Sequence, residues 1–180
     1  MNISILGSTR GSNLPGLYNG LTNTHVRIVG VISHKKDAGI LEKARTLKLN
    51  CAYIPGNTTT FEIACDKRLH ETKTEMIVLI GFMKILSPWF VQRWKNKIIN
   101  VHPSLLPKYA GLMDLNVHQA VLDNHETETG CSVHYVTEEI DAGKVIVQKI
   151  CAVLPNDTAE SLKVRVQMLE VEGLIEALTV

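Results

Sequence analysis

The chain has 180 residues, enough for one α/β domain with a sizeable core, and its 45% apolar content argues against global disorder. Its 19 basic and 18 acidic residues give a formal net charge of +1, so composition shows no nucleic-acid-binding footprint. No apolar run approaches the roughly 20 residues that span a bilayer. The opening residues carry no basic leader. We therefore expect a cytoplasmic protein that binds neither nucleic acid nor membrane.

The four cysteines are widely spaced, and no two of them form a Cys-x-x-Cys pair. Such spacing gives no local support for a zinc site or a redox motif. We expect reduced, buried thiols and no metal at Cys51, Cys65, Cys131 and Cys151.

Short apolar runs alternate with helix-like segments in the first half of the chain. We expect strands at 3–6, 26–32, 51–54, 76–80 and 97–101, and helices at 12–21, with Ser12 as N-cap, at 38–47 and at 59–72. The run at 76–80 is apolar throughout, which suits a strand buried on both faces. This alternation predicts a Rossmann-like α/β fold with a doubly wound, mostly parallel sheet.

The pattern changes after about residue 110. We expect a helix at 114–123, strands at 131–136 and 145–153 around a polar loop at 137–144, and a last helix capped by Asp157 or Thr158. The sequence has no internal repeat and no linker, which favours one domain over residues 1–180.

A glycine-containing loop, Gly7 to Asn13, follows the first expected strand. Glycine lets the backbone approach a ligand, and the free N–H groups at a helix start favour an anion. The spacing matches neither the P-loop nor the dinucleotide fingerprint. A capped tight turn explains the loop equally well, and the functional interpretation is a seat for a phosphate monoester.

The most informative stretch begins where the strand at 97–101 ends. Asn100 and His102 are two residues apart, so both side chains can point to the same side. Asparagine is a neutral donor suited to a developing oxyanion, and histidine can donate to the same oxygen or move protons. Pro103 and Pro107 stiffen the loop that follows.

The residues His-Pro-Ser-Leu-Leu-Pro-Lys-Tyr at 102–109, preceded by Asn100, resemble the signature of the folate-dependent phosphoribosylglycinamide formyltransferases. Four further segments resemble that family in the same order along nearly the whole chain. They are the substrate-phosphate loop at 11–13, the folate segment at 81–88, the catalytic-aspartate loop at 139–143, and the ribose-contacting helix with Arg165, Val166, Gln167 and Glu170.

The resemblance implies transfer of a formyl group from 10-formyltetrahydrofolate to the amino group of glycinamide ribonucleotide, a step of purine synthesis. Asn100 would donate to the oxyanion, His102 would be a second donor and part of the proton route, and Asp141 would orient the imidazole or a water. No metal and no covalent intermediate would be needed. Residues 1–100 would form the phosphate- and nucleotide-binding half, and residues 101–180 the catalytic and folate-binding half.

The resemblance also implies ligand contacts away from the reacting atoms. Gly11, Ser12 and Asn13 would bind the substrate phosphate, Gln167 and Glu170 the ribose, and His134 would support the catalytic groups from a strand nearby. The pteridine pocket would be lined by Met83, Lys84, Ile85, Leu86 and Leu112. The partners would be small-molecule substrates, and the chain would be a monomer or a homodimer.

Each of these residues also has a structural interpretation. Asn100 and His102 could satisfy a strand end, Asp141 could belong to a simple turn, and Gln167 and Glu170 could be solvated helix positions.

His118 suits helix packing, and Trp89, Phe90 and Trp94 suit packing rather than a stacking platform.

The sequence departs from the family pattern at four places. Lys144 stands where a proline is usual, Thr9 stands where a glycine is common, no basic residue occurs at 56–60, and Glu170 is followed by Val-Glu-Gly where a histidine-containing continuation is usual. These departures concern the folate-tail, phosphate-loop and ribose contacts and leave the reaction class unchanged.

Other functions fit parts of the pattern. A methionyl-tRNA formyltransferase would need a further C-terminal domain and a basic surface. A formyltetrahydrofolate hydrolase would be expected to carry an N-terminal regulatory domain, whereas here the first strand begins at Ile3. A non-catalytic nucleotide-binding module would use the glycine loop without Asn100, His102 and Asp141.

Overall fold

The computed structural model describes all residues, 1–180. Its seven-stranded sheet has the order β3-β2-β1-β4-β5-β6-β7. The pairings among β1 to β5 are parallel, whereas β6 and β7 pair antiparallel. The doubly wound, mostly parallel α/β fold predicted from the sequence is therefore confirmed. The chain divides into two compact units, residues 1–100 with Thr179, and residues 101–178 with Val180.

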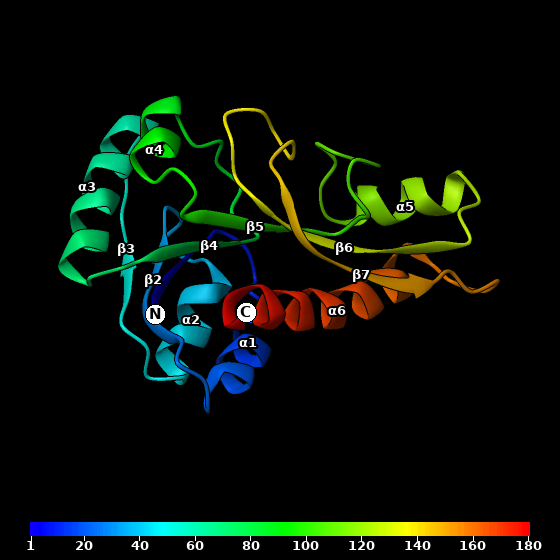
Figure 1. Cartoon of the computed structure of the whole chain (residues 1–180), viewed down its shortest axis with the longest axis horizontal. Coiled ribbons are helices and arrows are strands. Elements are labelled where there is room, and N and C mark those ends of the chain that lie inside the picture. Colours follow the sequence, from blue (N-terminus) through cyan, green and yellow to red (C-terminus); the bar gives the residue numbers. More distant parts are fainter. The chain divides into compact units, whose positions relative to one another are not determined.

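Unit 1 contains four complete strands and the first part of β5. Its elements are β1 (Asn2–Gly7), α1 (Asn13–Leu21), β2 (Arg27–Ser33), α2 (Gly39–Thr46), β3 (Cys51–Tyr53), α3 (Thr58–Glu71), β4 (Met76–Ile80), α4 (Pro88–Arg93) and β5 (Ile98–His102). Within this unit, α1 and α2 lie on one side of the strands, and α3 and α4 on the other (Figure 1). Because helices cover both faces, β1 and β4 are almost entirely buried, as the unbroken apolar run at 76–80 predicted.

The short helix α4 was not predicted from the sequence. Ser87 provides its N-cap, accepting a hydrogen bond from Phe90 N at 3.3 Å, and Pro88 stands in the first turn. The buried carboxylate of Glu62 on α3 accepts hydrogen bonds from the Ser87 N–H and hydroxyl, which ties α4 to α3. Phe90 and Trp94 are buried, so the packing interpretation is confirmed for these two rings, whereas Trp89 is 49% exposed and does not fit it.

Unit 2 contains the end of β5, then α5 (Leu115–Asp123), β6 (Glu128–Tyr135), β7 (Val145–Ala152) and α6 (Ala159–Thr179). Thr158 caps α6 with a reciprocal pair of hydrogen bonds to Ser161, so the predicted cap is confirmed at Thr158. Gly173 of α6 lies against Cys131 and Val133 of β6, where a Cβ would already be in contact with the strand.

Strand β6 begins three residues before the predicted start at Cys131. A Cβ on Gly130 would lie 1.8 Å from the Lys149 carbonyl oxygen, so only glycine allows β7 to approach here. The Glu-Thr-Gly segment at 128–130 has weak strand propensity, and pairing with β7 overrides it.

Candidate active site

The loops that follow β1 and β4 lie at neighbouring carboxyl ends of unit 1. In the strand order β3-β2-β1-β4-β5, the direction of winding reverses between β1 and β4. Ligands of open α/β sheets bind at such a switch point. The glycine loop after β1 and the segment at 81–86 after β4 are therefore in the position where this fold binds small molecules.

The glycine loop packs tightly against α2. Gly11 has φ +63°, and a Cβ there would lie 2.5 Å from the side chain of Ile40. This position therefore requires glycine for packing as well as for backbone conformation. Asn13 is buried, and Ser12 is exposed at the N-cap position of α1.

The predicted capping role of Ser12 is wrong. Its backbone is helical, with φ −58° and ψ −30°, and its side chain makes no capping hydrogen bond. A capping side chain needs an extended backbone to reach back to the helix N–H groups.

Ser8 joins the two loops of unit 1. Its hydroxyl oxygen accepts a hydrogen bond from Met83 N at 3.0 Å and lies 3.2 Å from Nδ1 of His34, at the end of β2. Burial lowers the pKa of His34, and the charges of Lys84 and Lys35 lower it further. His34 was not among the residues predicted from the sequence, because only the fold brings the ends of β1, β2 and β4 together.

The segment at 81–86 leaves two apolar side chains uncovered. Met83 is 43% exposed and Ile85 is 71% exposed, whereas Leu86 is buried. Lys84 is half-buried and donates to Thr58 Oγ1 at 3.5 Å. Exposed apolar side chains beside a strand end can cover a flat apolar ligand, which is the chemistry expected of a pteridine pocket. In unit 2, Leu112 is also exposed, at 38%.

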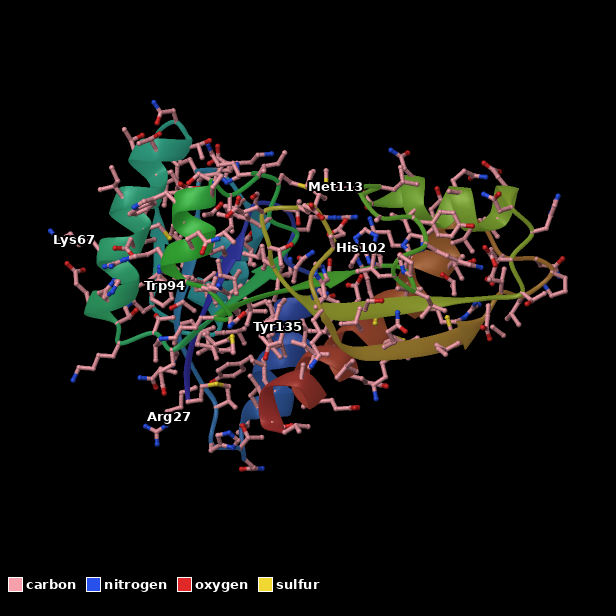
Figure 2. All side chains as sticks on the ribbon, turned by 45° about the horizontal axis from the view of Figure 1, so that its top comes forward. Arg27, Lys67, Trp94, His102, Met113 and Tyr135 are labelled. Carbon is pink, nitrogen blue, oxygen red and sulfur yellow. The ribbon has the colours of Figure 1, made fainter.

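A buried cluster of two histidines and one carboxylate lies in unit 2. His102 Nδ1 is 3.2 Å from Asp141 Oδ2, and His134 Nε2 is 3.5 Å from Asp141 Oδ1. All three side chains are nearly shielded from solvent, with exposed fractions of 4% for His102, 2% for His134 and 11% for Asp141. Figure 2 labels His102, Met113 in the loop that follows it, and Tyr135 at the end of β6.

Both ring nitrogens of His102 face hydrogen-bond acceptors. Nδ1 faces Asp141, and Nε2 lies 3.1 Å from the backbone carbonyl oxygen of Tyr109. A neutral imidazole has one N–H and can satisfy one acceptor, whereas the imidazolium satisfies both. Burial lowers the pKa of His102 below its ordinary value, and Asp141 and the Tyr109 carbonyl oppose that decrease. His102 is thus neutral at rest, and Asp141 and the Tyr109 carbonyl are the two neighbours that favour its cationic form.

Asp141 is held in the left-handed backbone region, with φ +53°, in the loop between β6 and β7. Its Oδ2 accepts a hydrogen bond from Gly111 N at 2.9 Å. Burial alone would raise its pKa, but the hydrogen bonds from His134 and Gly111 bring the pKa below its ordinary value. The carboxylate is therefore ionised and aimed at His102.

The remaining predicted residues lie on the expected elements. Asn100 is half-buried on β5, and Gln167 is half-buried on α6. Glu170 is buried beside Cys131, whose thiol pKa is raised to about 12 by burial and by the Glu170 charge. Burial rules out the interpretation of Glu170 as a solvated helix position.

Two contacts at the cluster were not predicted from the sequence. The Tyr109 carbonyl and the Gly111 N–H bind His102 and Asp141 through backbone atoms, which sequence patterns do not report. Gly111 follows Pro103 and Pro107, and this pattern indicates a defined turn. The pattern does not indicate which groups the turn contacts.

The structure contains neither a metal-binding cluster nor a membrane-spanning helix. No group of three or more His, Cys, Asp or Glu residues is arranged to hold a metal ion. None of the helices combines the length and the apolar character that crossing a membrane requires.

Comparison with known proteins identifies relatives along the chain. The family model described as formyl transferase matches residues 1–178. Phosphoribosylglycinamide formyltransferase of Escherichia coli is 38% identical over 176 residues, which cover 94% of this chain and 82% of that protein. The trifunctional purine biosynthetic protein adenosine-3 of Chironomus tentans is 39% identical over 93% of this chain, but the match spans only 13% of that protein.

Solved structures agree with the sequence comparison. Phosphoribosylglycinamide formyltransferase from Coxiella burnetii has a TM-score of 0.92 and 38% identity, covering 99% of this chain and 85% of that one. The enzyme of the same name from Anaplasma phagocytophilum has a TM-score of 0.92 and 34% identity, with the same coverage. The family model, the identity over most of the E. coli protein and the shared fold together show that this chain belongs to the formyl transferase family.

Proposed function

We propose that this chain transfers the formyl group from N10 of 10-formyltetrahydrofolate to the amino group of glycinamide ribonucleotide, in purine synthesis. The observation that carries the proposal is the buried His102–Asp141 pair, in which the carboxylate oxygen lies 3.2 Å from Nδ1 and orients an imidazole that can accept and return a proton. The E. coli relative is named for formyl transfer to this ribonucleotide, and the match covers 82% of its length.

The chemistry sets three requirements. The substrate amine attacks the formyl carbon, so a new C–N bond forms and negative charge develops on the formyl oxygen. The bond from that carbon to N10 then breaks, and the proton lost by the attacking nitrogen ends on N10. A catalyst must stabilise the oxyanion, carry the proton and align two substrates.

Three residues take these roles. Asn100 donates its side-chain N–H to the oxyanion, and His102 accepts the proton of the attacking amine and returns it to the leaving nitrogen. Asp141 orients the imidazole or a bound water, and its negative charge stabilises the imidazolium once formed. His134 supports Asp141 from β6. The formyl group passes directly to the amine, without a covalent enzyme intermediate.

Ligand contacts follow from the placement of the remaining residues. Gly11, Ser12 and Asn13 form the phosphate seat at the start of α1, where backbone N–H groups favour an anion. The exposed apolar groups of Met83 and Ile85, together with Lys84 and Leu86, serve the pteridine. Gln167 and Glu170 of α6 accept the ribose hydroxyls.

The test compares three formyl acceptors with one 10-formylfolate donor: glycinamide ribonucleotide, water alone and initiator methionyl-tRNA. Turnover only with the ribonucleotide is the expected result. Loss of the donor formyl group without any amine acceptor would instead identify a hydrolase. Donor binding without turnover would favour a non-catalytic binding module.

A further inference from the structure

Tyr109 adopts a backbone conformation that is unfavourable for its residue type. Its φ is +61°, in the left-handed region that bulky side chains rarely occupy. Such a conformation is unfavourable and persists only where surrounding contacts hold it. In this conformation the Tyr109 carbonyl oxygen lies 3.1 Å from Nε2 of His102. The unfavourable backbone therefore presents an acceptor to the proposed proton carrier.

Glu126, at the turn between α5 and β6, binds the side chains of Tyr109 and its neighbour. The Tyr109 hydroxyl donates to Glu126 Oε1 at 3.0 Å, and Lys108 Nζ donates to both carboxylate oxygens at 2.9 Å. These hydrogen bonds lower the pKa of Glu126, so the carboxylate is charged at neutral pH. One carboxylate thus fixes two consecutive side chains on a strained loop.

A second contact fixes the backbone on the near side of Tyr109. Ser104 Oγ donates to the Lys108 carbonyl oxygen at 2.5 Å. The loop is therefore anchored through its backbone at Lys108 and through the side chains of Lys108 and Tyr109. Outside the 103–111 loop, Glu126 binds the side chains of Lys108 and Tyr109, whereas Asp141 and Ser132 bind the loop backbone at Gly111 and Leu106, and the Leu112 N–H donates to the Tyr109 carbonyl oxygen at 3.2 Å.

We propose that Glu126 is a positioning residue for His102, acting through Tyr109. By holding the Tyr109 ring, Glu126 keeps the strained carbonyl oxygen at Nε2, where it accepts the second ring proton that His102 acquires during turnover. The catalytic part of this inference rests on the proposed function. The placement of the carbonyl does not, and it can be measured without substrates.

The effect can be read at His102 itself. The titratable groups that face its imidazole are Asp141 and His134, and the Tyr109 carbonyl is the remaining hydrogen-bond partner. Because that carbonyl raises the pKa of His102, its displacement must lower this pKa while Asp141 and His134 remain in place. A loss of general stability would not produce a directed shift at one histidine.

The experiment uses the full chain and three variants. Glu126→Ala removes the anchor, Tyr109→Phe removes the hydroxyl that binds Glu126 and Asn124 but keeps the backbone carbonyl, and the double variant combines the two changes. Glu128→Ala is the matched control, since it deletes an exposed carboxylate two residues further along. Each protein is titrated by NMR of labelled histidines and assayed for formyl transfer.

The expected result is a His102 pKa that is lower in Glu126→Ala and Tyr109→Phe than in the wild type, and unchanged in Glu128→Ala. A fall in kcat on the order of 10-fold, with both KM values nearly unchanged, should accompany it in Glu126→Ala. The double variant should lose no more than Glu126→Ala alone, since both changes break the same link.

An unchanged His102 pKa in folded Glu126→Ala protein would overturn the proposal, as would equal effects in Glu128→Ala. Where Glu126→Ala does not fold, Tyr109→Phe carries the same test with the Lys108 contact intact. If the His102 pKa shifts as expected but the wild-type protein transfers no formyl group, the positioning role of Glu126 is supported and the proposed function is rejected.

Discussion

Asp141 and His102 form a buried ion-pair geometry in which Oδ2 lies 3.2 Å from Nδ1, and the same oxygen accepts the Gly111 N–H at 2.9 Å. The backbone N–H fixes the carboxylate, and the carboxylate in turn fixes the imidazole. This order of support means that the imidazole can change its protonation state without having to be reoriented.

Replacing His102 by alanine should lower kcat by about 10²- to 10⁴-fold, the usual contribution of a general acid or base. Ligand binding should persist, because no other proposed contact is removed. Steady-state kinetics and donor binding by titration check this. Wild-type turnover in His102→Ala would remove the residue from the proton route.

Asp141→Asn should shift the pH dependence in a defined direction. The Asp141 charge raises the pKa of His102, so the neutral amide should let that pKa fall further below its ordinary value. If neutral His102 accepts the proton, wild-type activity is lost as pH falls through this pKa. The acidic limb of the kcat/KM profile should therefore move to lower pH, and the plateau should drop.

The control for this experiment is Asp123→Asn, which neutralises an exposed carboxylate on α5. Its profile should match that of the wild type. A limb that stays in place or moves to higher pH in Asp141→Asn would contradict the assigned coupling of the two residues.

Asn100→Ala should cost about 10²- to 10³-fold in kcat if its amide donates to the oxyanion. KM for both substrates should change little, because the interaction forms only in the transition state. Asn116→Ala, which removes an exposed amide from α5, serves as the control. Equal kinetics for the two variants would reject the oxyanion role.

The Asp157–Arg165 pair should matter for stability rather than turnover. Arg165 donates to both carboxylate oxygens, at 2.6 and 2.8 Å, and the Asp157 side chain is only 4% exposed. The Arg165 hydrogen bonds hold the pKa of Asp157 far below its ordinary value. The ionised Asp157 carboxylate therefore stabilises the fold fully at pH values above its unfolded-state pKa of about 3.9. This stabilisation is lost as the pH falls towards the folded-state pKa.

Asp157→Asn should lower the free energy of unfolding at neutral pH by about 1.5–3 kcal/mol. Urea denaturation at several pH values checks this, and the gap from the wild type should narrow under acid conditions. A gap that is independent of pH would show that the charge of Asp157 is not what stabilises the end of β7 against α6.

Gly11 and Gly111 allow a matched comparison of packing and conformation. Both have positive φ, +63° and +79°, but a Cβ would lie 2.5 Å from Ile40 at Gly11 and meets nothing within 4 Å at Gly111. Alanine at either position costs about 1–2 kcal/mol in backbone conformation. Gly11→Ala should cost more than Gly111→Ala in thermal unfolding, because α2 must also move; equal losses would show that packing adds nothing.

Much of the fold could be predicted from the sequence, because apolar runs mark its strands directly. The run at 76–80 coincides with β4, and Thr158 caps the last helix as expected. The short helix α4 was missed, since its cap depends on Glu62, which only the tertiary fold brings to Ser87. Likewise, Gly130 belongs to a strand only because β7 approaches it.

The candidate site was predictable where side chains carry the chemistry and unpredictable where the backbone does. His102 and Asp141 were chosen from the sequence, and the structure places them together. The carbonyl of Tyr109 and the N–H of Gly111 have no sequence signature, because every residue type carries these groups. Ser12 shows that a side-chain signal can also mislead. Serine is a favoured capping residue, but the helical backbone at Ser12 does not let its side chain cap α1.

The most direct test of direct formyl transfer to glycinamide ribonucleotide is to follow an isotopic label from the formyl carbon of 10-formyltetrahydrofolate. We predict that the label appears in formylglycinamide ribonucleotide, one for one with the tetrahydrofolate released, with none in formate. Label recovered as formate, or folate released without labelled ribonucleotide, would contradict the account.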